Sequence, residues 1–300
     1  MLKKIKSRKT ISTLLATLVI LVLALTGCGT TQTPQPQAAS TPTPANPNLI
    51  LATTTSTQDS GLLEVLIPEF QKKTGYTVKT VAVGTGAALA MGEKGDADVL
   101  LVHAPSSEKK LVDNQTMINY NLVMHNDFVL VGPASDPAKI KGMKTSVEAF
   151  KAIEASQSVF MSRGDRSGTD TMEKSLWAKA NLKPAGKWYQ ETGSGMGQTL
   201  TMASDKASYT LTDRATFLAN QKNLKLEILV QGEAALLNIY HVGQVNPEKF
   251  PKVNQEGAKA FVNFMLDPDT QKTIGEFGKD TVGQALFFPD AGKKMEDLGK

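Results

Sequence analysis

Cysteine is almost absent from this sequence of 300 residues, which has one, Cys28, close to its amino terminus. Beyond that position the chain has no thiol, so the folded part can form no disulfide. Aromatic residues are also few, at 6%, and no stripe of basic residues runs along the chain. Because binding of nucleic acid depends on a basic surface, this composition argues against nucleic acid as a partner.

Histidine is scarce too. The three histidines, His103, His125 and His241, lie far apart and form neither a metal-binding spacing nor a triad-like motif. An enzyme would need such a cluster, or a nucleophile beside a base, and a lone histidine is more often structural. The sequence therefore predicts no catalytic residue, no metal site and no cofactor.

Most of the excess positive charge lies in the first 27 residues. Five Lys and Arg residues precede an apolar stretch at 11–25, and the small residue Gly27 precedes Cys28. This order is typical of a secretory signal peptide, and the apolar stretch is short for a permanent membrane span. The whole chain has 33 basic and 29 acidic residues, so without the five basic residues of the signal 28 stand against 29. A nearly neutral mature protein has no strong overall positive field. If it binds a small anion, the attraction must therefore come from the local geometry of a site.

The residues from Leu25 to Cys28 resemble the lipobox of bacterial lipoproteins. This resemblance implies that residues 1–27 are removed, that Cys28 is acylated, and that the protein is extracytoplasmic and anchored to the cell membrane. The alternative is an ordinary signal peptide whose cleavage site contains cysteine. Residues 28–47 follow as an uncharged linker rich in Pro, Thr and Gln, which cannot bury a core and predicts an extended tether.

From residue 48 onward, strand patterns alternate with helix patterns. The predicted strands are 49–52, 76–83 and 98–102, and helices are predicted at 62–73, at 87–93 and from about 107. This alternation predicts an α/β fold with parallel sheets and a ligand at the carboxyl ends of the strands.

The length of the folded part suits two lobes better than one core. We interpret the apolar run 128–133 as a crossing from one lobe into the other. The predicted first lobe is formed by residues 48–126 and 237–300, and the predicted second lobe by residues 127–236.

Two turns rich in hydrogen-bond donors fall at the same predicted edge of the sheet. Thr53–Thr57 is a run of five hydroxyl residues between a strand and a helix, which is more than capping a helix requires. Gly84-Thr85-Gly86 follows the next strand, although glycines at such turns are common and this signal is weak by itself. We therefore expect the hydroxyl turn to contact a ligand.

The stretch Ser162–Thr169 carries the sharpest signal. Arg163 offers a planar fork of charged donors, two hydroxyl residues follow it, and Gly168 lets an anion approach main-chain N–H groups. The helix predicted at 169–180 directs the positive end of its dipole to the same place. This combination predicts a site for a tetrahedral oxyanion. The alternative is a Gly/Ser-rich turn in which the arginine caps a carbonyl.

Four stretches, in the same order along the chain, resemble the tungstate-binding lipoproteins of Tup-type ABC transporters: 52–57, 98–104, 162–169 and 209–214. The resemblance covers residues 48–290. It implies a two-lobed type II periplasmic binding protein fold whose parallel-sheet lobes are joined by two crossover segments. It also implies a monomer that binds tungstate, and to some degree molybdate, between the lobes and delivers it to the permease of an ABC importer.

Carried over to this sequence, the resemblance implies these ligand-binding residues: Thr54, Thr55, Ser56, Thr85, Arg163, Ser167, Gly168, Thr169 and Thr210. We interpret Asp165 as the partner that orients Arg163 and Asp98 as a strand-start residue, whereas the direction of Arg166 stays open. Because the element at 163–169 is similar to one in phosphate-binding proteins, molybdate, phosphate and sulfate remain alternatives. A sensor subunit that presents a bound ligand to a membrane receptor also remains one.

Overall fold

The structure is a computed structural model that describes residues 43–298. The predicted signal peptide, Cys28 and most of the predicted linker lie outside these residues. Within them, no helix combines the length and the hydropathy that a membrane span needs.

Three parallel strands begin the fold. β1 (Asn48–Thr54) pairs in parallel with β2 (Thr77–Val83) on one side and with β3 (Val99–Val102) on the other. The predicted strands at 49–52, 76–83 and 98–102 are thereby confirmed. The strand residues of β3 are all buried, as a continuously apolar run predicts for a central strand.

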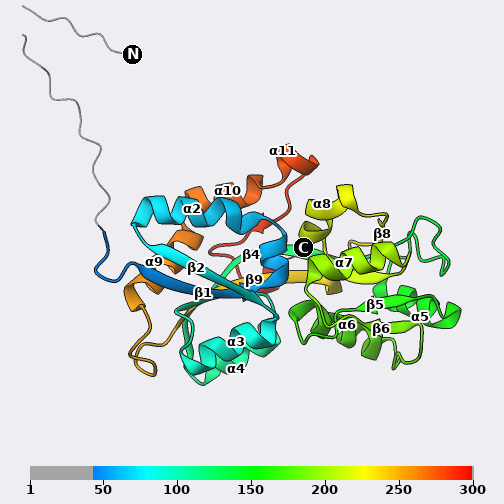
Figure 1. The fold of residues 1–300 in the computed structure, drawn as a ribbon, viewed down its shortest axis with the longest axis horizontal. Helices are drawn as coiled ribbons and strands as arrows, with labels where there is room; N and C mark the ends of the chain where they lie inside the picture. Colours follow the sequence, from blue (N-terminus) through cyan, green and yellow to red (C-terminus); the bar gives the residue numbers. More distant parts are fainter. Residues whose placement is uncertain (1–42, 299–300) are drawn as a thin grey trace, which may run out of the picture. The chain divides into compact units, whose positions relative to one another are not determined.

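The helices of this part follow these strands: α1 (Thr55–Asp59), α2 (Leu62–Thr74), α3 (Thr85–Lys94) and α4 (Pro105–Asp113). Figure 1 shows α2 on one face of the sheet and α3 and α4 on the other. α2 is capped by Gly75, whose φ of 78° is the left-handed conformation that favours glycine. Pro68 lies inside α2 and is exposed, so the ring that removes a helical hydrogen bond faces solvent.

Two long strands make the sheet mixed rather than purely parallel. β9 (Leu237–Val245) runs antiparallel to β3 on one side and to β4 (Met117–Gly132) on the other. The short β10 (Phe288–Pro289) adds to the outer edge of β4, which gives the order β10-β4-β9-β3-β1-β2. The prediction of parallel strands therefore holds for β1 to β3 and is wrong for β4 and β9, whose apolar runs do not reveal strand direction.

β4 changes its partners between Asp127 and Phe128. Up to Asp127 it pairs with β9, and from Phe128 it pairs with β7 (Thr210–Asp213) and β8 (Glu227–Val230). One strand thus belongs to both halves of the fold. The division into lobes at residue 127 stays a prediction.

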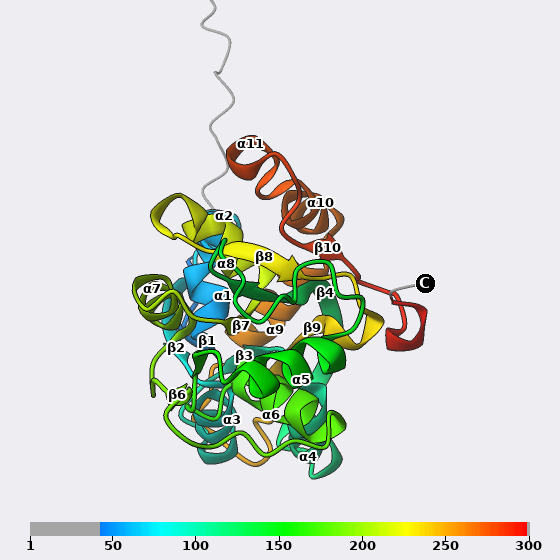
Figure 2. The ribbon, with the colours of Figure 1, turned by 90° about the vertical axis from the view of Figure 1, so that its right-hand side faces the viewer.

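The elements between β4 and β9 surround a second group of buried residues. They are α5 (Ser146–Ser156), β5 (Phe160–Ser162), α6 (Gly168–Lys179), β6 (Tyr189–Glu191), α7 (Met196–Asp205), α8 (Arg214–Asn220) and the 3₁₀ turns Gln221–Asn223 and Ala234–Leu236. β5 and β6 pair in parallel. Figure 2 shows α5 and α6 side by side. Trp177 on α6 is buried and packs edge-to-face on Phe150 and Phe160.

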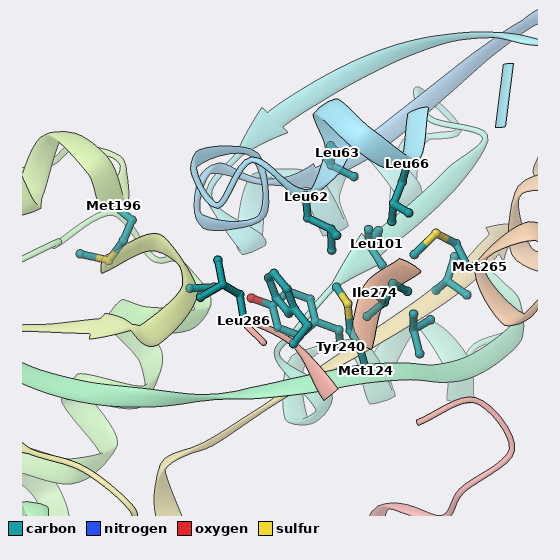
Figure 3. Packing of buried hydrophobic residues seen from close by; sticks show 14 of the residues in the cluster. Leu62, Leu63, Leu66, Leu101, Met124, Met196, Tyr240, Met265, Ile274 and Leu286 are labelled. Carbon is teal, nitrogen blue, oxygen red and sulfur yellow. The ribbon is translucent and has the colours of Figure 1, made fainter. Parts of the chain in front are cut away.

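The carboxyl-terminal part is mostly helical: α9 (Gln255–Leu266), α10 (Pro268–Glu276), α11 (Lys279–Val282) and a 3₁₀ turn at Met295–Asp297. Figure 3 shows Leu62 and Leu66 of α2, Met265 of α9 and Ile274 of α10 in one hydrophobic cluster with Tyr240 of β9. This packing fixes α2 and β9, and hence the ends of the strands from which the candidate site is built.

Candidate functional site

The hydroxyl turn lies at the carboxyl end of β1. Thr54 caps α1, since its Oγ1 accepts a hydrogen bond from the Thr57 main-chain N at 3.2 Å. The Thr54 Oγ1 and Ser56 Oγ atoms lie 2.9 and 3.1 Å from Nε2 of His103, which follows β3. These side chains are all buried. Two neighbouring strand ends therefore form one polar cluster.

Arg163 lies on the loop between β5 and α6 and is 1% exposed. Its Nη2 donates to Thr55 Oγ1 at 2.8 Å and to Asp165 Oδ2 at 2.5 Å. The predicted pairing of Asp165 with Arg163 is thereby confirmed. The bond to Thr55 joins the loop to the hydroxyl turn.

Two carboxylates hold the conformation of this loop by accepting hydrogen bonds from its main-chain N–H groups. Asp165 Oδ1 accepts from the N of Ser167 at 3.1 Å, and the Asp170 oxygens accept from the N of Gly164 at 3.2 Å and of Arg166 at 3.0 Å. The side chain of Arg166 is exposed, which settles its direction toward solvent. The two carboxylates are thus engaged by main-chain donors, by Arg163 and by Lys174.

Three donor atoms of this loop remain without a partner. Among residues 43–298, none forms a hydrogen bond with Arg163 Nε, Arg163 Nη1 or Thr169 Oγ1, although all three atoms are buried. Buried polar atoms are nearly always hydrogen-bonded, so unpaired donors call for an explanation. Thr169 lies in the first turn of α6, where the helix dipole favours negative charge, and Arg163 lies on the loop that leads into this helix. This arrangement suits a ligand that offers several acceptor oxygens.

The turn at Gly84 packs directly on the same loop. Thr85 Oγ1 accepts from the N of Gly168 at 2.8 Å, and the N of Gly86 donates to the Arg166 carbonyl at 3.4 Å. A Cβ atom at Gly84 would come within 3.1 Å of the Asp165 carbonyl oxygen, so glycine permits this close approach. The turn at Gly84 therefore contacts the Arg163 loop, and this loop is bonded to the hydroxyl turn through Thr55.

Most residues predicted to bind the ligand are joined by the contacts described above, but Thr210 differs. Its Oγ1 donates to the Met161 carbonyl at 2.7 Å and so holds β7 to β5. Asp98 stands apart as well, because it accepts from the N of Ile50 at 2.6 Å and of Asn254 at 2.7 Å. Asp98 is thus the strand-start residue that the sequence predicts.

Sequence reasoning missed His103, which it treated as structural. Its Nε2 contacts the hydroxyl turn, and its Nδ1 lies 2.8 Å from Asn238 Oδ1 on β9. Burial, aided by the charge of Arg163, lowers the pKa of His103 to about 4, so its ring is neutral at pH 7. Its position directly after β3, at the edge that holds the other two turns, is a signal that could have revealed it.

A buried carboxyl, Glu173 on α6, gives a testable pH dependence. Burial raises its pKa to about 7, although Trp177 Nε1 and the Tyr189 hydroxyl both donate to its Oε1. An unfolded glutamate titrates near about 4.3. Between these two values the folded protein holds more protons than the unfolded chain, so the free energy of unfolding falls as pH rises.

Glu173→Gln keeps an acceptor for both donors and removes this titration. We expect the variant to gain stability relative to wild type as pH rises, by on the order of 3 kcal/mol at pH 8. Urea unfolding of both proteins from pH 4.5 to 8 measures the difference between their free energies of unfolding. The contributions of the other titrating groups are the same in both proteins and cancel in this difference. Two parallel curves of stability against pH would show that Glu173 is ionised at its ordinary pKa.

Known proteins that are similar to this chain identify its family. The family model described as PBP superfamily domain matches residues 34–269. The chain is 48% identical over 244 residues to the tungstate-binding protein TupA of Peptoclostridium acidaminophilum, a match that covers 81% of this chain and 85% of that protein. This chain belongs to the TupA family.

Solved structures support the same assignment. One, described as the tungstate ABC transporter from Geobacter sulfurreducens, is 47% identical, has a TM-score of 0.71, and the match covers 77% of this chain and 98% of that chain. Another, TupA from Desulfovibrio alaskensis, is 47% identical with a TM-score of 0.68, and the match covers 82% of this chain and 99% of that one. The two-lobed α/β fold of type II periplasmic binding proteins, which the resemblance predicted, is thereby confirmed.

Proposed function

We propose that this TupA-family protein captures tungstate, and also molybdate, between two lobes and delivers it to the permease of an ABC importer outside the cytoplasm. The names of its relatives support the anion and the transport role. The observation that carries the proposal is the Arg163 guanidinium, which is buried with Nε and Nη1 unpaired on the loop that leads into α6. We take residues 48–126 with 237–300 as one lobe and residues 127–236 as the other.

The choice among anions rests on the donors and acceptors of the loop. Tungstate and molybdate are fully deprotonated near neutral pH, so a site for them needs donors and no acceptor. Asp165 and Asp170 are engaged by Arg163 and by main-chain N–H groups of the loop. A protonated phosphate would instead gain from an acceptor that faces it. The proposed contacts are Thr55, Ser56, Thr85, Arg163, Ser167, Gly168 and Thr169. The resemblance implied Thr54 and Thr210 as well, but the Thr54 hydroxyl lies against His103 and the Thr210 hydroxyl donates to the Met161 carbonyl.

Calorimetric titration of residues 29–300 against tungstate, molybdate, sulfate and phosphate tests the proposal. We expect tungstate and molybdate to bind at least about 100-fold more tightly than the other two, a difference of about 2.7 kcal/mol. Tighter binding of phosphate or sulfate would mean that this anion, and not tungstate, is the ligand of the site. If none of the four binds, the proposed function is wrong. Stimulation of the permease ATPase by the loaded protein separates uptake from a sensor role.

The membrane anchor gives a separate prediction. We propose that Cys28 becomes the acylated first residue of a mature monomer. Wild-type protein is then expected in the membrane fraction and to incorporate labelled palmitate, whereas Cys28→Ala should abolish the labelling and either release the protein or block its processing. Unmodified wild-type protein in the soluble fraction would contradict the anchor.

A further inference from the structure

A chain of buried side chains runs behind the hydroxyl turn. His103 Nδ1 lies 2.8 Å from Asn238 Oδ1, Asn238 Nδ2 donates to Asn126 Oδ1 at 2.8 Å, and Asn126 Nδ2 donates to Asp213 Oδ1 at 3.4 Å. Asn126 and Asn238 face each other across β4 and β9. No member of the chain is more than 4% exposed. It therefore links the end of β3 to Asp213 at the start of α8.

The carboxylate at one end fixes the direction of every bond in this chain. An ionised Asp213 only accepts, so Asn126 must turn its NH₂ group toward it and its oxygen toward Asn238. Asn238 in turn directs its NH₂ group to Asn126 and its oxygen to His103. Burial raises the pKa of Asp213 to about 6, which leaves it ionised at pH 7.5. A neutral His103 must then carry its hydrogen on Nδ1, and its Nε2 is an acceptor.

We propose that His103 is a positioning residue: its Nε2 accepts the hydroxyl hydrogen of Thr54 and so leaves the hydroxyl hydrogen of Ser56 for the anion. Thr54 is the closer donor, at 2.9 Å against 3.1 Å for Ser56. The Thr54 oxygen already accepts from the Thr57 N and lies 2.7 Å from the Thr57 hydroxyl. The inference rests on the proposed function and deepens it, because it separates a supporting hydroxyl, Thr54, from a binding one, Ser56.

The far end of the chain returns to the same turn. Asp213 Oδ1 accepts from the N of Thr216 at 2.9 Å, and Thr216 Oγ1 donates to the Ser56 carbonyl at 3.0 Å. Ser56 is therefore held at its carbonyl through α8, whereas its hydroxyl lies beside His103 and gives it no hydrogen. The bond from α8 fixes the main chain that carries the hydroxyl that we assign to the anion.

The tautomer of His103 can be measured directly by ¹⁵N NMR at pH 7.5, without any variant. With three histidines in the chain, each ring gives a distinct set of signals. We expect His103 to be protonated on Nδ1 and bare on Nε2, both before and after addition of tungstate. An Nε2–H tautomer in the wild-type protein would overturn the proposal.

Asn126→Leu tests what sets this direction. Asp213 Oδ1 accepts both from Asn126 and from the N of Thr216, so this variant interrupts the chain and leaves the cap of α8 in place. Without the Asn126 oxygen, Asn238 can turn its NH₂ group toward His103. We expect a measurable Nε2–H population of His103 in this variant, with the signals of His125 and His241 unchanged as internal controls. An unaltered His103 tautomer would show that Asp213 does not orient the chain.

A double-mutant cycle tests the division between the two hydroxyls, with tungstate as the probe. Ser56→Ala should weaken binding by about 10- to 100-fold, the usual effect of a donor lost from a charged acceptor. Thr54→Val should weaken it similarly, because Ser56 then turns its hydrogen to His103, whereas Thr54→Ser should bind as wild type does.

The double variant should bind no more weakly than Ser56→Ala. Losses that multiply would mean that both hydroxyls contact the anion, and the proposal would be wrong. If wild-type protein fails to bind tungstate, the proposed function fails, while the tautomer measurement still decides the role of His103.

Discussion

Arg163→Ala is expected to weaken tungstate binding by roughly two to three and a half orders of magnitude. Removing one partner of a buried, hydrogen-bonded charge pair costs about 3–5 kcal/mol, and each 1.4 kcal/mol is tenfold in affinity. The structure supports this magnitude, since Arg163 is 1% exposed and its Nη2 is engaged by Asp165 and Thr55. The substitution removes the two unpaired donors and also leaves Asp165 without its cation.

Arg163→Lys is the matched control, because lysine keeps the charge and loses the planar fork. It should bind more tightly than Arg163→Ala and more weakly than wild type, and it could change the ratio of the affinities for tungstate and molybdate. Calorimetry gives the affinities, and urea unfolding shows whether each variant is folded. A folded Arg163→Ala protein that binds tungstate as wild type does would place the site elsewhere.

Trp177→Ala should lower the free energy of unfolding by about 3–5 kcal/mol, the range for removing a large buried aromatic side chain. The Trp177 ring lies 4.2 Å from the Phe150 ring centre and 5.4 Å from that of Phe160, and its Nε1 donates to Glu173. The variant therefore leaves a cavity between α6 and the rings that Trp177 contacts. The first turn of the same helix belongs to the candidate anion site.

Trp177→Phe retains one ring of this cluster and is expected to lose clearly less stability. Guanidinium unfolding at pH 5 and pH 8 measures both variants, and the lower pH keeps the Glu173 carboxyl protonated. A loss below about 1 kcal/mol for Trp177→Ala would be typical of an exposed residue and would contradict the packing of this core.

Local patterns were enough to predict the first half of the fold. β1 to β3 and the helices between them follow from apolar runs, hydroxyl turns and the glycine cap of α2, each of which acts within a few residues. The loop at Arg163 was likewise predictable, because its donors, its carboxylates and the helix start are neighbours in sequence. Chemistry contained within one short segment can be inferred from that segment.

Features that depend on distant segments could not be predicted. β9 lies between β3 and β4, and nothing in its own residues specifies antiparallel neighbours. His103 gains its role from Asn238, 135 positions further along the chain. The residues of β7 are all buried, so alternation does not tell which face the Thr210 hydroxyl takes, and the structure directs it to Met161. Direction and partner choice in a sheet are properties of the assembled strands.

The continuous strand β4 has a mechanical consequence for the motion of one half of the fold against the other. Because Met117–Gly132 is bonded to β9 before Asp127 and to β7 and β8 after it, a rotation of one half against the other must be absorbed where the bonding changes. The beginning of β9 at Leu237, opposite Asp127, lies at the same level. If the protein closes over an anion as proposed, the halves would turn about this one level of the strands, and each loaded molecule would present the same surface to the permease.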